Sequence, residues 1–175
     1  IAFKHALSSI QFKVQLSADY SSTFKLTSIK VGRVKYSGTF TENITEEFDE
    51  VDGKKTLKSS ENNPSWSVAD NQILNTTPYV AFSGSVQLNK NTGDDAKNYV
   101  NQYLALDGVD GQNDLILMPQ VLPDEAELEI VYTVNKKEES STVKLSELNI
   151  KKWEIGHRYT YNITLGYDLI LVGAT

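Results

Sequence analysis

Residues 159–171 have the most regular pattern in this sequence, because large apolar or aromatic side chains occupy every second position. These positions are Tyr159, Tyr161, Ile163, Leu165, Tyr167, Leu169 and Leu171. A period of two residues is typical of a half-buried β-strand. At about 3.3 Å per residue, such a strand would be roughly 40 Å long, about twice the usual length. We therefore expect it to bend or to divide in two, with Gly166 as the favoured place.

Alternating apolar positions recur along the rest of the chain, and residues typical of turns separate them. The clearest examples are residues 79–88 and 126–134. In residues 24–36 the alternation changes phase twice, which predicts a bent strand or two short ones. About eight to ten strands with few helix signals predict an all-β sandwich. A length of 175 residues suits one domain, and we assign residues 1–175 to it.

Two stretches in the first third of the chain predict local irregularities. The apolar positions of residues 1–16 shift by one residue at Ser8 and Ser9, which predicts a β-bulge or a kink. Residues 42–65 are polar and acidic, and Asp52-Gly53 is a sequence typical of two-residue hairpin turns. We expect a surface hairpin or a long loop there.

Two stretches later in the chain differ from simple alternation. Residues 92–104 begin with a capping sequence and place apolar side chains on one side, which predicts at most one short helix. Residues 115–118 form a continuous apolar run that Pro119 ends. Such a run predicts a strand that is buried on both faces.

Composition excludes several kinds of site and partner. The chain has no cysteine, so disulfides and cysteine-based metal sites are excluded. A net charge of −6 disfavours general attraction to nucleic acid or anionic lipid. No apolar run approaches the roughly 20 residues of a transmembrane helix. The chain opens on Ile1 without a signal peptide, so we interpret it as a processed or trimmed piece of a longer protein.

The two histidines are the main candidates for catalysis, and both have a simpler interpretation. His5 shares an alternating set with Leu7, so we expect a partly buried, hydrogen-bonded residue. His157 precedes the long strand in a turn, and a two-histidine metal site would need the rings to be adjacent in space. The sequence also lacks a nucleophile elbow and a glycine-rich phosphate loop. We therefore expect no enzymatic activity and no cofactor.

Oxygen ligands and exposed aromatic rings leave two binding hypotheses open. Asp107, Asp110 and Asp114 could gather around calcium, but their spacing does not fit an EF-hand, and a solvated acidic loop is the simpler interpretation. The tyrosines that could stack on sugar rings also suit half-buried strand positions. These tyrosines are Tyr20, Tyr36 and Tyr103.

Three stretches together resemble the fimbrillin-like proteins of Bacteroides-type bacteria, the subunits of type V pili. The first is the segment 3–14, with the sequence FKHALSSIQFKV. The second joins LMPQ at 117–120 to LEIVY at 128–132. The third and most specific is WEIGHRYTYNITL at 153–165. Their order and approximate spacing match over nearly the whole chain.

This resemblance implies an extracellular, antiparallel, transthyretin-like β-sandwich that corresponds to the C-terminal part of a two-domain pilin. It also implies a cell-surface or outer-membrane location, a lipoprotein precursor, and other pilin subunits as partners. In the family, a neighbour's strand fills a groove that proteolysis opens. Two departures are the missing region that would carry an N-terminal domain and lipid-attachment cysteine, and the missing tryptophan that usually follows the last strand.

The end of the long strand is the candidate assembly element. Its residues are apolar at consecutive positions and therefore on both faces: Leu169, Ile170, Leu171 and Val172. Such a segment is either a core strand covered on both faces or a strand that pairs with another subunit. We expect a structural or adhesive pilus subunit that assembles by β-strand exchange. The alternative is a β-sandwich module that binds carbohydrate or a host surface.

Overall fold

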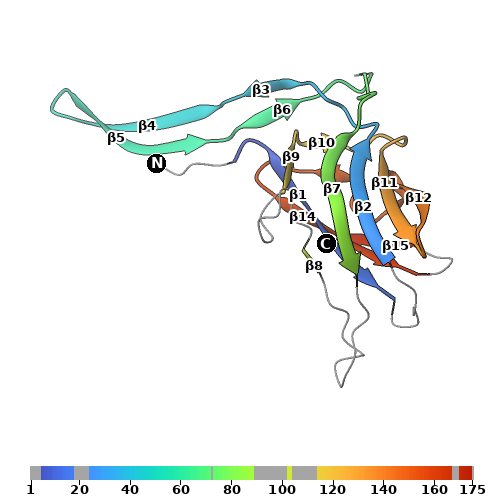
Figure 1. The fold of residues 1–175 in the computed structure, drawn as a ribbon. Helices are drawn as coiled ribbons and strands as arrows, with labels where there is room; N and C mark the ends of the chain where they lie inside the picture. Colours follow the sequence, from blue (N-terminus) through green and yellow to red (C-terminus); the bar gives the residue numbers. More distant parts are fainter. Residues whose placement is uncertain are drawn as a thin grey trace.

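The protein is built from β-strands throughout the part of the chain that its structure describes (Figure 1). In this computed structural model, the described residues are 5–17, 24–71, 73–88, 102–103, 114–166 and 170–174. They form fifteen strands and one short 3-10 helix, η2 (Leu145–Glu147), and they contain no α-helix. The all-β prediction is confirmed. The strands outnumber the expected eight to ten because several span only two or three residues.

The helix expected over residues 92–104 is wrong at its C-terminal end, where the structure tests it. Gln102–Tyr103 form the short strand β8, and the rest of the segment lies outside the described residues. Here β8 pairs antiparallel with a long strand, so that Tyr103 lies opposite Lys13. Backbone pairing with that strand therefore prevails over the local helical pattern.

The first sheet combines the two ends of the chain in the order β15-β14-β1-β8, and β9 also pairs with β1. Its strands are β1 (Ser8–Leu16), β8 (Gln102–Tyr103), β9 (Leu115–Leu117), β14 (Arg158–Leu165) and β15 (Ile170–Ala174). The central pair, β1 and β14, is parallel over eight residue pairs, and the other pairs in this sheet are antiparallel. Alternation alone does not predict which distant strands pair.

The second sheet has the order β12-β11-β2-β7, and all of its pairs are antiparallel. Its strands are β2 (Phe24–Gly32), β7 (Tyr79–Leu88), β11 (Glu127–Val134) and β12 (Lys137–Lys144). Irregular register between β2 and β7 occurs at Leu26/Ser28 and at Ile29/Lys30. The shift at Leu26/Ser28 coincides with the first predicted change of phase, between Leu26 and Ile29. The second predicted change, between Val31 and Val34, lies where β2 ends at Gly32 and Arg33 has a φ of 55°. A third pair, β10 (Gln120–Val121) with β13 (Lys152–Trp153), lies outside both sheets.

One hydrophobic core joins the inner faces of the two sheets, which Figure 1 shows as two layers. Alternate residues of β1 are buried, and the same alternation is present in β14. Across their parallel pairing, Phe12 lies beside Tyr161 with ring centroids 5.7 Å apart. The second sheet contributes Leu128 and Ile130, both fully buried. The sandwich prediction is confirmed by this arrangement.

The long terminal strand divides at the expected place. Strand β14 ends at Leu165, Gly166 follows, and β15 returns antiparallel to β14 with Ile170 opposite Leu165. The alternating segment therefore forms a hairpin at one edge of the first sheet instead of a single strand of double length.

The phase change at Ser8 and Ser9 marks the start of β1 instead of a bulge within it. The Ser8 side chain is buried and its hydroxyl donates to the Glu154 carbonyl at 2.8 Å. The two preceding positions of the other phase, His5 and Leu7, are exposed. The prediction of a partly buried His5 is therefore wrong, because its segment lies before the strand and outside the core.

The prediction of a strand buried on both faces at residues 115–118 is also wrong. Strand β9 covers Leu115–Leu117, with Leu117 buried and Ile116 54% exposed. It pairs with β1 and turns only one face toward the core, so its other face meets solvent.

A long arm of two-stranded ribbons extends away from the sandwich (Figure 1). Its strands are β3 (Thr39–Thr41), β4 (Ile44–Val51), β5 (Lys54–Asn62) and β6 (Ser65–Ser67). Strand β3 pairs with β6, and β4 pairs with β5. Asp52 and Gly53 form the turn with φ of 53° and 72°, both in the left-handed region that such turns require. The surface hairpin predicted for this region is confirmed.

Candidate assembly edge of the first sheet

Strand β15 is the terminal strand of the first sheet, and its backbone forms the edge of that sheet. Five residue pairs join it to β14, from Leu165 opposite Ile170 to Tyr161 opposite Ala174. Within the described residues, no strand pairs with its other side. An edge strand presents unpaired backbone N–H and C=O groups on that side. This edge can therefore accept hydrogen bonds from, and donate them to, a further strand.

The side chains that the structure describes on β15 differ in burial. Val172 is partly buried and packs against the core, whereas Gly173 is exposed. A Cβ added at Gly173 would meet no atom within 4 Å, so the backbone is openly accessible there. Leu169 lies outside the described residues, and Ile170 and Leu171 belong to the strand. The inward-facing Val172 fits either of the two expected roles of the segment.

A buried hydrogen bond anchors β14, and with it the edge. The Trp153 indole donates from Nε1 to Tyr161 Oη at 3.0 Å, and both side chains are buried. Burial raises the pKa of Tyr161 to about 12, although the hydrogen bond from Trp153 lowers it. Next to them, Tyr159 Oη accepts from the Glu154 backbone at 2.9 Å. The tryptophan and tyrosines of the most family-like stretch therefore fix the strand that carries β15.

The turn between Trp153 and β14 depends on a glycine. Gly156 has a φ of 72°, and its N–H donates to the Leu7 carbonyl at 3.1 Å. In turn, the Ser9 N–H donates to the His157 carbonyl at 2.9 Å. These two bonds attach the start of β1 to the start of β14, so the parallel pair begins in register.

Both histidines line one hollow of about 640 Å³, together with Asp114 and Arg158. The Asp114 carboxylate pairs with Arg158 Nε at 2.5 Å and accepts a hydrogen bond from the Ser9 hydroxyl. His157 Nδ1 lies 2.9 Å from the Ile155 carbonyl oxygen, which fits the turn role expected for it. In a serine–histidine–aspartate triad, a histidine lies between the serine and the aspartate. Here the Ser9 hydroxyl donates directly to Asp114, so these residues do not form such a triad.

The calcium hypothesis is tested at only one of its residues. Asp114 is engaged by Arg158 and Ser9, and Asp107 and Asp110 lie outside the described residues. Among the described residues, no three His, Cys, Asp or Glu side chains are grouped as a metal site would require. Of the tyrosines considered for sugar stacking, Tyr36 is 51% exposed, and the side chains of Tyr20 and Tyr103 lie outside the description.

In the described part of the chain, no helix has the length and apolarity that a membrane-spanning helix needs. No curated protein was found to match the chain. Among solved structures, the fold is similar to that of a "putative cell adhesion protein" from Bacteroides uniformis ATCC 8492, with a TM-score of 0.51 and 9% sequence identity. The similarity covers 99% of this chain and 50% of that one, so the chain spans half the length of that protein.

The comparison with protein families gives a match over the entire chain. The family model described as fimbrillin-like matches residues 1–175, which include all three stretches on which the resemblance was based. The structural similarity is low in sequence identity and supports the fold alone. This chain belongs to the fimbrillin-like family.

Proposed function

We propose that the protein is a structural or adhesive subunit of a cell-surface pilus, located on a fimbrium or at the outer membrane. The observation that carries this proposal is the fimbrillin-like match over residues 1–175. The similarity in fold to a protein described as a putative cell adhesion protein is consistent with it. Its partners are other pilin subunits, and its precursor is a lipoprotein. This role requires no catalysis.

We further propose that the subunits join by exchange of the C-terminal strand. The candidate assembly segment is residues 169–172, of which 170–172 belong to β15. In this exchange, β15 leaves its own sheet and pairs with β14 of a neighbouring subunit, in the register that β15 has with β14 here. A neighbour's strand then makes the same backbone hydrogen bonds, so exchange has a small cost in contacts. When each subunit donates its strand to the next one and the rotation between neighbours does not close a ring, repeated exchange produces an open filament.

Electron microscopy of the full-length, protease-processed protein tests the pilus role. We expect filaments from the intact protein, and monomers from a chain shortened after Gly166, because the shortened chain lacks β15. If the processed protein stays monomeric and the deletion changes nothing, strand exchange is wrong.

Cysteine cross-linking tests the strand pairing itself. Because the sequence contains no cysteine, any disulfide must join two introduced cysteines. Asn162 and Gly173 are opposite one another across β14 and β15. When an Asn162→Cys chain is mixed with a Gly173→Cys chain before assembly, we expect a disulfide between the two chains. A Thr160→Cys chain mixed with Gly173→Cys is the matched control, because Thr160 lies on the same strand two residues out of register.

The outcomes distinguish the pilus role from the exchange of the C-terminal strand. Filaments that form without the register-specific disulfide would support the pilus role and refute exchange of this strand. Equal cross-linking of the Thr160→Cys and Asn162→Cys chains would also refute the register.

A further inference from the structure

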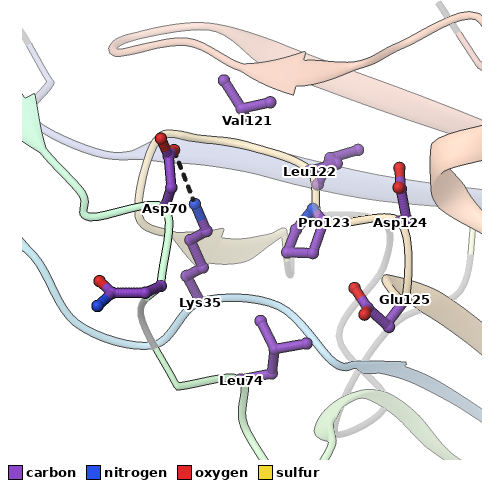
Figure 2. A pocket seen from close by; sticks show the side chains of 9 residues that line it. Lys35, Asp70, Leu74, Val121, Leu122, Pro123, Asp124 and Glu125 are labelled. Carbon is purple, nitrogen blue, oxygen red and sulfur yellow. Dashed lines mark ion pairs between the residues drawn. The ribbon is translucent and has the colours of Figure 1, made fainter.

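A second hollow, of about 430 Å³, lies at the end of the sandwich beside Lys35 (Figure 2). Segments far apart in the sequence meet there: the bridge between Lys35 and Leu74, the turn at Asp70, and the loop that leads from β10 to β11. The lining includes Lys35, Asp70, Leu74, Leu122, Asp124 and Glu125. Charged side chains and apolar side chains therefore face the same space.

The backbone of Lys35 is fixed from both sides by amide side chains. Gln120 is buried, and its Oε1 accepts from the Lys35 N–H at 2.8 Å while its Nε2 donates to the Lys35 carbonyl at 2.9 Å. The preceding residue, Val34, donates its N–H to Asn75 Oδ1 at 2.8 Å and accepts from the Asn75 N–H at 2.9 Å. Such reciprocal bonds hold Lys35 in place before any ligand arrives.

The Lys35 side chain is buried, yet its ammonium has little to bind. Only 9% of the side chain is exposed, and its ionic partner is Asp70 Oδ1 at 3.8 Å, beyond hydrogen-bonding distance. The structure gives the ammonium no hydrogen bond to any described residue, although it carries three donors. Figure 2 shows the side chain extending into the hollow toward Asp70. Its donors are therefore available to a ligand, and burial strengthens any bond they make.

The rim supplies acceptors on a fixed loop. Asp70, Asp124 and Glu125 are exposed and line the hollow, Asp70 beside the Lys35 ammonium and the other two across from it (Figure 2). The loop that carries Asp124 is held by the Ser146 hydroxyl, which donates to the Asp124 carbonyl at 3.0 Å. Three carboxylates repel an anionic ligand, and a simple cation cannot accept the hydrogen bonds that the Lys35 ammonium donates. This charge pattern favours a neutral ligand with both donors and acceptors.

We propose that this hollow binds one ring of a neutral saccharide. A sugar hydroxyl accepts a hydrogen bond from Lys35 Nζ, neighbouring hydroxyls donate to Asp70 or Asp124, and the C–H face of the ring packs on Leu74 and Leu122. The volume lies in the usual range for small-molecule sites. The site is far in sequence from the assembly strand and does not depend on the pilus proposal.

The test is a titration of the ¹⁵N-labelled full chain, followed by amide chemical shifts. The probes are methyl α-glucoside, methyl α-mannoside, methyl β-galactoside and N-acetylglucosamine, with acetate and lysine amide as charged probes. We expect at least one neutral sugar to shift the amides of Lys35, Leu74 and Leu122, and the charged probes to leave them unchanged. Lys35→Met keeps the apolar stem and removes the donor, and we expect it to weaken binding at least tenfold.

Two further variants make the result specific. Lys58→Met removes an exposed lysine of the arm, and we expect sugar affinity to be unchanged. Asp70→Asn replaces a fully exposed side chain, so folding is unaffected, and we expect affinity to fall severalfold. Circular dichroism shows whether Lys35→Met folds. If it does not, the affinity of Asp70→Asn decides whether the sugar binds in this hollow.

Three results would overturn the proposal. The first is the absence of shifts at these amides with every neutral sugar. The second is an affinity unchanged by Lys35→Met or, where that variant does not fold, by Asp70→Asn. The third is binding of the charged probes alone, which would assign the hollow to another class of ligand.

Discussion

The sandwich and the arm are built from strands of similar length, but they bury their side chains very differently. Strand β11 places Leu128 and Ile130 in the core with no exposed surface. In the arm, every residue of β4 is exposed, and Phe48 lies opposite Leu57 with about half of each side chain in solvent. Regular strand pairing is therefore present in both regions, but only the sandwich adds a core to it.

This difference means that the stabilities of the two regions have different origins. A two-stranded hairpin alone is marginally stable in water, because it has no second layer to cover its apolar side chains. At the base of the arm, Trp66 packs on Phe40 and donates from Nε1 to the Ala6 carbonyl at 2.6 Å. The base is thus attached to the body of the protein, whereas the ribbon beyond it depends on its turn and its cross-strand pairs.

The largest expected difference follows from removing one leucine from each region. Leu128→Ala leaves a cavity in the core, so we expect the free energy of unfolding to fall by about 2–5 kcal/mol. Leu57→Ala on the arm is the matched control, and we expect a change within about 0.5 kcal/mol. Urea unfolding followed by tryptophan fluorescence measures both. Similar losses for the two variants would show that the arm is packed on something in solution.

Much of this contrast could be predicted from the sequence, because its causes are local. Alternation located the long strands, Asp52-Gly53 located the tip of the arm, and Gly166 located the division of the last strand. The acidic residues before the turn indicated a solvated hairpin, and Glu50 does lie opposite Lys55. Each of these features depends on neighbours within a few residues.

Features that depend on distant neighbours were not predictable. The parallel pairing of β1 with β14 joins residues about 150 positions apart, and the sequence of neither strand indicates that the other is its partner. Lys35 looks like an ordinary exposed lysine, and the hydrogen bonds that hold its backbone come from Gln120, 85 residues away. The exposure of Ile116 likewise depends on where the first sheet ends. Alternation predicts that one face is apolar, but it does not predict what covers the other.

The next largest effect concerns the buried tyrosine of the sandwich at alkaline pH. An unfolded tyrosine ionises near pH 10, whereas Tyr161 in the folded protein has a pKa of about 12 because it is buried. Below pH 10 both states are neutral, so stability is unaffected. Between about pH 10 and 12 the unfolded state loses the proton more readily than the folded state, so stability falls as pH rises, by about 2 kcal/mol at pH 12.

Urea unfolding at pH 9, 10, 11 and 12 checks this dependence. In Tyr161→Phe, we expect the difference between pH 9 and pH 12 to shrink by that amount, with a loss of about 1 kcal/mol at pH 9 for the hydrogen bond to Trp153. Tyr36→Phe is the matched control at a half-exposed position, and we expect it to keep the wild-type profile. An identical pH profile in Tyr161→Phe and the wild type would refute the assignment to this tyrosine.

The smallest expected effect is confined to the tip of the arm. Gly53 has a φ of 72°, which an alanine adopts at a cost of about 1 kcal/mol. The ribbon of β4 and β5 has no core, so it can open without the sandwich. We therefore expect Gly53→Ala to speed amide hydrogen exchange at Phe48 and Leu57 about fivefold. The urea midpoint of the sandwich should stay unchanged. Gly173→Ala is the matched control, since a Cβ there meets no atom within 4 Å. A shift of the urea midpoint by Gly53→Ala alone would mean that the arm and the sandwich unfold as one unit, and the contrast between them would then hold for burial but not for stability.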